Sequence, residues 1–380
     1  MIYQVAITGI LLILFCFNIY TNYFHYKNFL LLNILNIVLS YFIFKESNIF
    51  FSLVMLYCLS SSCYHSTYLK PIHYAHPTGG LNTSLLINIA KSYLMLIFCS
   101  LFFITIPVNE FLISIKILHV INILMTLVPA KYTFFKTETN ETSKSPICGF
   151  DANISTNATL LSLMSCSYLI DFGQNIYFNS CVLMLTFLAI LKTTASVGLI
   201  SFTASIMIFI LTSSSASASI MVVAAAIVCL MVAAIFRSKF KPGSRIFSIS
   251  GRDNIFRFVN KWIKPRSNKY FGSGIGSFSY VFPATHQQIS SQSLNQFKIA
   301  NYIWLHSDVY QFYIEGGLIG FFLGSIAFLY AIYLCILSNN YAGLCFLASY
   351  LLNSLGNFPN HLVPDIITIV VMFKFIATLG

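Results

Sequence analysis

Hydrophobic residues in this chain fall in long blocks that short polar segments separate. Each block is about as long as an α-helix that crosses a bilayer, roughly 20 residues. The pattern therefore predicts twelve transmembrane helices. We expect them near residues 3–20, 28–44, 48–62, 83–107, 110–130, 155–171, 174–191, 193–212, 215–236, 311–336, 340–356 and 362–379.

Three polar connections are much longer than the others, at 63–82, 131–154 and 237–310. Each follows an odd-numbered predicted helix, so all three are expected on one side of the membrane. With a cytoplasmic N-terminus, that side is the periplasm or the cell exterior. The chain then divides into transmembrane helices 1–9 in 1–236, a large extracytoplasmic loop in 237–310, and transmembrane helices 10–12 in 311–380.

Composition narrows the class of protein further. Hydrophobic residues make up 57% of the chain and charged residues 8%, whereas a soluble domain carries about 25% charged residues. A water-exposed globular surface is thereby excluded. We predict an all-α polytopic membrane protein of about twelve helices, and the lipid bilayer is its first expected partner.

The positive charge is concentrated in the longest loop. The formal net charge is +11, and 11 of the 21 lysines and arginines lie between Arg237 and Lys298. Positively charged segments normally stay in the cytoplasm, but segments longer than about 60 residues are translocated largely regardless of charge. We therefore keep the loop outside and expect its charge to meet a phosphate-bearing molecule. Nucleic acid is not expected, because no recognition fold fits a loop between two membrane helices.

An amphipathic helix is predicted from Ser250-Gly251-Arg252 to Pro265. Its apolar face carries Ile255, Val259 and Trp262. Its basic face carries Arg257, Lys261 and Lys264, a spacing typical of a helix that lies in the membrane interface. Arg252 falls on the apolar side and should point into the protein, where a guanidinium is a natural bidentate ligand for phosphate or diphosphate.

Two further segments follow in the loop. The run Gly272-Ser273-Gly274-Ile275-Gly276-Ser277-Phe278 lacks the strand and helix that would make it a nucleotide-binding loop, so we interpret it as a flexible turn. A close approach of its backbone to a ligand is the alternative. In the next segment, Asp308 and Gln311 predict a helix N-terminus. His306 would stand just outside this helix, where the helix dipole disfavours a protonated imidazole and attracts anions. A neutral histidine there suits a general base.

Polar residues continue along the helix that begins at this point. Asp308, Gln311 and Glu315 share one face and are expected to line a cavity, because such a stripe cannot face lipid. Gly316, Gly317 and Gly320 are expected to allow close helix packing.

Ionisable residues inside other apolar runs are further candidates. Lys91 is the deepest and is a candidate diphosphate ligand, although snorkelling or an interhelical hydrogen bond explains it equally well. Lys116 and His119 share a face and favour a packing role, and Asp171 at a helix end is expected to be solvated. Arg245 in the large loop is a reserve ligand for the diphosphate.

The order of these segments resembles a known superfamily. His306-Ser307, followed by Gly317-x-x-Gly320, resembles the signature of the bacterial O-antigen ligase family. Ser250-Gly251-Arg252 and then Gly272-x-Gly274-x-Gly276-x-Phe278 precede it in the same order as in that family. Related O-antigen and capsule polymerases and protein O-oligosaccharyltransferases belong to the same superfamily. The resemblance covers roughly residues 190–325.

The resemblance implies an inverting glycosyltransferase, independent of metal and cofactor, whose site faces the periplasm from the bacterial inner membrane. The donor would be a glycan on undecaprenyl diphosphate, and the acceptor a hydroxyl of lipid A-core or of a growing glycan. His306 would be the catalytic base and Arg252 a ligand of the diphosphate. The family has another arginine at the start of a middle helix, where this chain has Leu191-Lys192-Thr193-Thr194-Ala195, so Lys192 is the candidate cation there.

Two alternatives stay open. Within the same superfamily, the chain would be an O-antigen or capsule polymerase that joins repeat units on the lipid carrier. From a different class, it would be a transporter of lipid-linked glycan or polysaccharide. Transporters commonly show repeated halves and interrupted helices at mid-membrane, and the sequence shows neither, whereas one dominant loop with a histidine at its end favours an enzyme.

Overall fold

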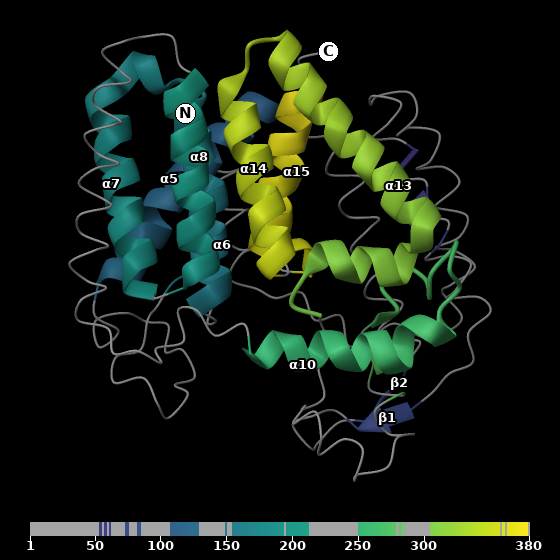
Figure 1. Ribbon diagram of the computed structural model, residues 1–380. Coiled ribbons are helices and arrows are strands. Elements are labelled where there is room, and N and C mark those ends of the chain that lie inside the picture. The colour runs from purple at the N-terminus through teal and green to yellow at the C-terminus, as the bar shows by residue number, and fades with distance from the viewer. Residues whose placement is uncertain are drawn as a thin grey trace. The chain divides into compact units, whose positions relative to one another are not determined.

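The computed structural model describes residues 53–54, 57–58, 61, 73–75, 82–84, 107–128, 149, 154–193, 195–212, 250–278, 281–282, 285, 305–357, 359–361 and 363–378. These residues are mostly helical, as expected (Figure 1). The predicted helices at 3–20, 28–44 and 215–236 lie outside the described residues, as does nearly all of the helix predicted at 83–107. The predicted start of that helix at residue 83 is wrong, because Asn82–Ser84 form the strand β2.

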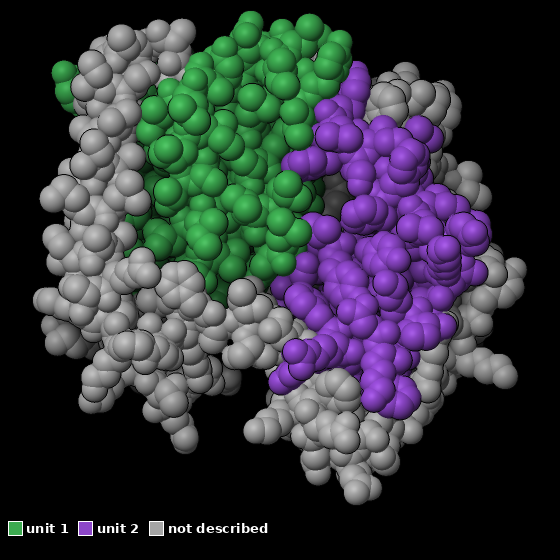
Figure 2. Space-filling model, viewed as in Figure 1, with its two compact units in different colours: residues 1–18, 106–248, 331–380 green, residues 19–105, 249–330 purple. Residues whose placement is uncertain are grey.

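The chain forms two compact units, coloured separately in Figure 2. Unit 1 comprises 1–18, 106–248 and 331–380, and unit 2 comprises 19–105 and 249–330. Each unit therefore combines segments that are far apart in the sequence. The helix expected at 311–336 belongs to unit 2 up to Tyr330.

Unit 1 is a bundle of apolar helices. Its described elements are α5 (Val108–Leu127), α6 (Ile154–Ser165), η3 (Cys166–Leu169), η4 (Phe172–Asn175), α7 (Ile176–Thr193), α8 (Ser196–Thr212), α14 (Tyr341–Gly356), η8 (Pro359–His361) and α15 (Val363–Ala377). α8 packs against α14 and α6, and α6 packs against α7 and α5. A Cβ atom at Gly198 of α8 would lie 2.8 Å from the carbonyl oxygen of Ala158 of α6. Glycine at this crossing lets the two backbones approach closely.

Three of the described helices are long and apolar enough to cross a membrane. They are Val108–Leu127, Phe172–Thr193 and Asp308–Leu337. α8 and α14 are apolar but shorter. The chain therefore has the helices of a membrane protein, and the predicted division between 174–191 and 193–212 corresponds to two separate helices, α7 and α8.

Polar side chains join the helices in the interior of unit 1. Asn353 of α14 accepts a hydrogen bond from Thr159 Oγ1 (3.0 Å) and donates one to Ser162 Oγ (2.8 Å), both on α6. Asn357 Nδ2, just after α14, also donates to Thr159 Oγ1 (2.8 Å). All four residues are buried. Between apolar helices, such hydrogen bonds supply specific attraction that lipid-like side chains lack.

Unit 2 contains the segments that the sequence singled out. Its described elements are β1 (His73–Ala75), β2 (Asn82–Ser84), α10 (Ser250–Phe258), the π turn η6 (Val259–Ile263), η7 (Lys264–Arg266) and the first part of α13 (Asp308–Leu337). β1 and β2 pair antiparallel, with His73 opposite Ser84. The helix predicted from Ser250 to Pro265 is thus present as a continuous run of α, π and 3-10 turns.

α13 consists of two arms that meet at Gly317. This residue has φ 62° and ψ −165°, which is far from helical, and the chain bends sharply there (Figure 1). The first arm carries Asp308, Gln311 and Glu315, and the second arm is apolar. At 1.5 Å per residue, the second arm is about 30 Å long and is sufficient to cross a bilayer by itself.

Candidate functional site

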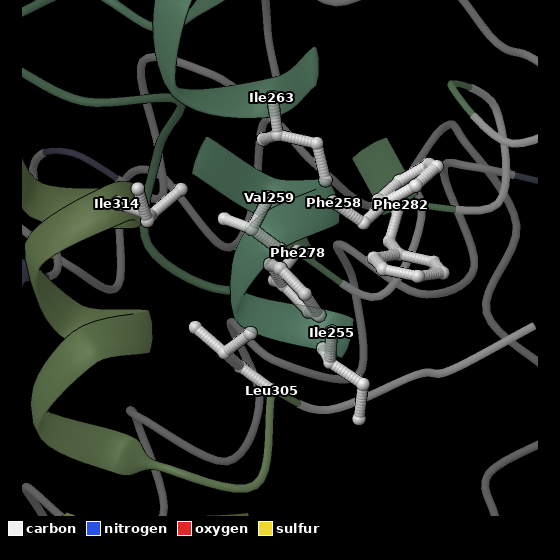
Figure 3. Packing of buried hydrophobic residues seen from close by; sticks show 8 residues of the cluster. All are labelled: Ile255, Phe258, Val259, Ile263, Phe278, Phe282, Leu305 and Ile314. Atoms are coloured by element: carbon white, nitrogen blue, oxygen red, sulfur yellow. The ribbon is translucent and has the colours of Figure 1, made fainter. Parts of the chain in front are cut away.

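One apolar cluster in unit 2 joins the three motif segments (Figure 3). Its buried members are Ile255, Phe258, Val259, Ile263, Phe278, Phe282, Leu305 and Ile314. Ile255 follows Arg252 by one helical turn, Phe278 ends the glycine loop, and Leu305 directly precedes His306. Since all of these side chains are almost completely buried, their packing holds the three segments together.

The π turn shifts the register of the amphipathic helix. The backbone N–H of Lys264 bonds to the carbonyl oxygen of Val259, which lies five residues earlier. The added residue brings Ile263 into the core, and Trp262 is partly buried and packs against the same cluster. The predicted apolar face of Ile255, Val259 and Trp262 is therefore confirmed, and Ile263 extends it. The basic face is as predicted, since Arg257, Lys261 and Lys264 are exposed.

Arg252 lies in the first turn of α10. The structure describes its backbone but not its side chain. Its predicted role at a diphosphate stays a prediction. Its helix is held near the segment of His306, because Ile255 on the same helix is only 2% exposed and packs in the cluster that includes Leu305.

The N-terminus of α13 is capped by Ser307, not by Asp308. The backbone N–H of Tyr310 donates to Ser307 Oγ (3.4 Å), and Asp308 is the first helical residue. Gln311 Oε1 reaches back to accept a hydrogen bond from the backbone N–H of Leu305 (3.0 Å). The predicted cap pair is therefore wrong by one residue at its first member, although Gln311 does turn back toward the start of the helix.

His306 precedes this cap in an uncommon backbone conformation. Its φ is 59°, in the left-handed region, and the residue is partly buried. The backbone turns at His306 so that Leu305 enters the core and Ser307 begins the helix. The imidazole therefore stands at the positive end of the first arm of α13, where an anion or a developing negative charge is stabilised.

The glycine loop is hydrogen bonded to the bend of α13. The backbone N–H groups of Ser273 and Gly274 donate to the carbonyl oxygens of Ile314 (3.0 Å) and Glu315 (2.8 Å). On the other side of the bend, the N–H of Leu318 donates to Lys269 O (3.0 Å). Breaking the helix at Gly317 leaves these groups without intrahelical partners, and the loop supplies them.

Glycines make this close approach possible. A Cβ atom at Gly272 would overlap the carbonyl of Glu315, and one at Gly317 would overlap the carbonyl of Tyr270. Both glycines have positive φ, 71° and 62°. The glycine spacing in the two motifs thus serves backbone-to-backbone packing between them.

The carboxylate of Glu315 completes the connection. Its two oxygens accept hydrogen bonds from the backbone N–H groups of Gly276 (2.9 Å) and Phe278 (2.8 Å). Gln311 Nε2 donates to it as well (3.2 Å). The residue is 4% exposed, so these donors replace the water that a carboxylate otherwise binds. Glu315 therefore holds the glycine loop in place.

The predicted polar stripe is present and buried. Asp308, Gln311 and Glu315 are each at most 4% exposed. None of the three lines the groove that is described next, and a cavity beside this stripe stays a prediction. The hydrogen bonds that Gln311 and Glu315 form with Leu305, with each other and with Gly276 are structural.

A groove of about 500 Å³ lies beside the bend, between the basic end of the amphipathic helix and α13. Its lining residues are Asn260, Lys264, Pro265, Ser267, Asn268, Lys269, Tyr313, Ile314 and Gly317. Sequence reasoning missed Asn260, Asn268 and Tyr313, because their approach depends on how the helix and α13 pack. In the sequence, the polar run directly after Pro265 is the feature that could have indicated this groove.

Lys192 forms hydrogen bonds to the end of a neighbouring helix. It lies in the last turn of α7 in unit 1, and its ammonium donates to the carbonyl oxygens of Thr126 (2.9 Å) and Leu127 (3.0 Å). These are the last residues of α5. A cation at the C-terminal end of a helix satisfies free carbonyls and is favoured by the helix dipole. Both bonds are structural, and the diphosphate role of Lys192 stays a prediction. Lys91 and Arg245 lie outside the described residues.

Lys116 and His119 of α5 have partners within unit 1. Lys116 Nζ lies 2.6 Å from Asp171 Oδ1, and the Asp171 side chain is still 36% exposed. Asp171 is therefore in contact with solvent, as predicted, and also forms an ion pair. His119 is buried, with its Nε2 3.2 Å from Thr186 Oγ1 on α7. Both contacts join α5 to neighbouring segments, in agreement with the expected packing role.

No family model matches the chain, and no curated protein matches its sequence. The resemblance of the ordered motifs therefore rests on the residues themselves.

Proposed function

We propose that the protein is a membrane glycan transferase of the O-antigen ligase type. It would move an undecaprenyl-diphosphate-linked O-antigen or similar polysaccharide to an acceptor hydroxyl. The observation that carries the proposal is the shared apolar cluster of Ile255, Phe278 and Leu305. This transfer needs a base and a diphosphate ligand in one place, and the cluster joins the segments that carry the two candidates, His306 and Arg252.

The proposed chemistry needs few groups. His306 takes the proton of the attacking sugar hydroxyl as the new glycosidic bond forms with inversion at the anomeric carbon. The bond from that carbon to the diphosphate breaks, and the carrier leaves as undecaprenyl diphosphate. Arg252 offers two parallel N–H groups to the departing phosphate oxygens. No carboxylate pair of the glycosidase kind is required, because diphosphate is already a good leaving group.

The proposal includes the membrane arrangement. About twelve helices would cross the bacterial inner membrane, and residues 237–310 would form a loop on the periplasmic side. The basic face of α10 and η6, with Arg257 and Lys261 exposed, would lie against the lipid head groups. Supporting this arrangement are the three long apolar helices and the bend that separates a polar arm of α13 from an apolar one.

The deciding experiment uses purified protein, a labelled undecaprenyl-diphosphate glycan, and lipid A-core as acceptor in half of the reactions. Gel analysis of product length distinguishes the reactions. We expect label to move onto lipid A-core, and to do so only when that acceptor is present.

Two other results would contradict the ligase proposal in different ways. A ladder of longer lipid-linked chains without lipid A-core would identify a polymerase of the same chemistry. Movement of the lipid-linked glycan across a bilayer without any new glycosidic bond would identify a transporter.

A further inference from the structure

The groove beside the bend of α13 is lined by side chains that donate hydrogen bonds. Lys264 and Lys269 contribute ammonium groups, and Asn260 and Asn268 contribute amides. No aspartate or glutamate is among the residues that line it. A ligand that fits such a lining is rich in acceptors and negatively charged.

The two asparagines are oriented by the protein through their oxygens. Asn260 Oδ1 accepts a hydrogen bond from Tyr310 Oη (2.6 Å). Asn268 Oδ1 accepts from the backbone N–H groups of Tyr270 (2.9 Å) and Phe271 (3.1 Å). With each oxygen engaged, the Nδ2 group is the part of each amide that remains to donate. The donors are thus set before a ligand arrives.

The positive charge of the groove is not neutralised by the described part of the chain. No described carboxylate forms an ion pair with Lys264 or Lys269, and both residues are exposed. The ammonium of Lys264 lies over the ring of Tyr313, 5.4 Å from its centroid. This contact places the charge at the wall of the groove and leaves it available to an anion.

The groove also lies near His306 along the chain, on the first arm of α13. Tyr313 lies five residues after Asp308, the first residue of α13, so the rise of an α-helix places it roughly 8 Å along the first arm. His306 precedes Asp308 by two residues. Gly317, at the bend, closes the groove on the other side. A ligand in the groove would thus be close to the proposed reaction centre without occupying it.

We propose that this groove binds an acidic sugar of the transferred glycan, through a carboxylate or phosphate substituent held by Lys264 and Lys269. The inference rests on the proposed function, since it names the class of glycan that the transferase takes. Asn260 and Asn268 donate to the same substituent or to neighbouring ring oxygens. The groove selects charged over neutral glycans and positions the chain relative to His306.

The test is a binding measurement that needs no turnover. The full-length protein is placed in nanodiscs of neutral phosphatidylcholine, and binding of hexagalacturonate is compared with that of neutral maltohexaose by calorimetry. We expect hexagalacturonate to bind at least about tenfold more tightly, because charge-assisted hydrogen bonds are the stronger class. A phosphorylated oligosaccharide in a third arm shows whether phosphate or carboxylate is preferred.

Variants assign the binding to the groove. Lys264→Gln and Lys269→Gln should each weaken hexagalacturonate binding by roughly tenfold. Arg257→Gln is the matched control, because Arg257 is an exposed cation of the same helical stretch and does not line the groove. It should leave binding unchanged. Elution of each variant as a single species in gel filtration checks the fold.

Results that contradict the acidic-sugar inference differ from results that contradict the proposed function. Equal binding of hexagalacturonate and maltohexaose, or an equal loss in Arg257→Gln, would overturn the inference. Abolition of glycan binding by phosphatidylglycerol in the nanodiscs would overturn it in favour of a lipid-headgroup site. A protein that transfers neutral glycan but shows no acidic preference would overturn the inference alone. One that binds acidic glycan in the groove but transfers none would overturn the proposed function alone.

Discussion

His306 combines a chemical group with an unusual backbone. Its φ of 59° lies in the left-handed region, which costs a non-glycine residue about 1–3 kcal/mol. Asparagine and histidine tolerate this region better than most residues. Strain of this kind persists where the surrounding packing imposes it, and here Leu305 and Ser307 anchor both sides. Such strained positions are common at functional sites.

Replacing His306 with asparagine tests the contribution of the imidazole separately from that of the backbone conformation. His306→Asn retains a residue that accepts positive φ but removes the imidazole, and His306→Ala removes both. We expect both variants to lose transfer by at least about 100-fold, the usual contribution of a general base. The measurement is transfer of labelled glycan at equal amounts of membrane-inserted protein. Wild-type transfer by His306→Asn would exclude His306 as the base.

Arg252 is tested by a substitution that keeps its charge. Arg252→Lys replaces a planar fork with a point charge, which does not reproduce a bidentate contact to diphosphate. We expect transfer to fall by at least about tenfold, mainly through loss of transition-state stabilisation. Arg257→Lys, on the exposed face of the same helix, is the control and should retain transfer. If the two variants transfer equally well, Arg252 only anchors the helix.

At the scale of elements, the bend of α13 and the glycine loop form one structural feature. Backbone hydrogen bonds from Ser273, Gly274 and Leu318 cross between them, and the Glu315 carboxylate accepts from the loop. The positions of His306 and of the groove both depend on the direction of the first arm. Loosening this connection is therefore expected to affect site geometry and stability together.

Adjacent glycines allow a matched test of the bend. Gly317→Ala would overlap the carbonyl of Tyr270 at a positive φ, whereas a Cβ at Gly316 meets its nearest neighbour at 3.5 Å. We expect Gly317→Ala to lower the thermal stability of the detergent-solubilised protein markedly, by the equivalent of about 2 kcal/mol or more. Gly316→Ala should be nearly neutral. Equal melting temperatures for the two variants would mean that the bend is not required.

At the scale of the whole molecule, α13 makes a prediction about topology. Its N-terminal end carries His306 and its C-terminal end reaches the polar turn 338–340. If its apolar arm spans the membrane, the two ends face opposite sides. An epitope inserted between Ser290 and Ser291 should be accessible on intact spheroplasts. One inserted after Asn339 should become accessible only after permeabilisation. The reverse pattern would place the basic loop in the cytoplasm and exclude a periplasmic transferase.

The helical class and many element positions follow from the sequence alone. Long apolar blocks leave no alternative to helices, because a backbone in lipid must satisfy its hydrogen bonds internally. The predicted starts near 110, 174, 340 and 362 therefore lie within two residues of α5, α7, α14 and α15. The amphipathic pattern around Ile255 and Val259 correctly predicted a buried face.

Other features depend on contacts between distant segments, which a one-dimensional pattern does not contain. The π turn adds Ile263 to the core beside the partly buried Trp262, a register that regular helical spacing does not predict. In the sequence, Glu315 is only a polar residue on a predicted helix. The structure shows that the glycine loop supplies hydrogen-bond donors to its carboxylate. The groove exists only where the end of the basic helix packs against Tyr313. The residue types were visible in the chain, but their partners were set by packing, since each hydrogen bond depends on positions that the fold alone brings together.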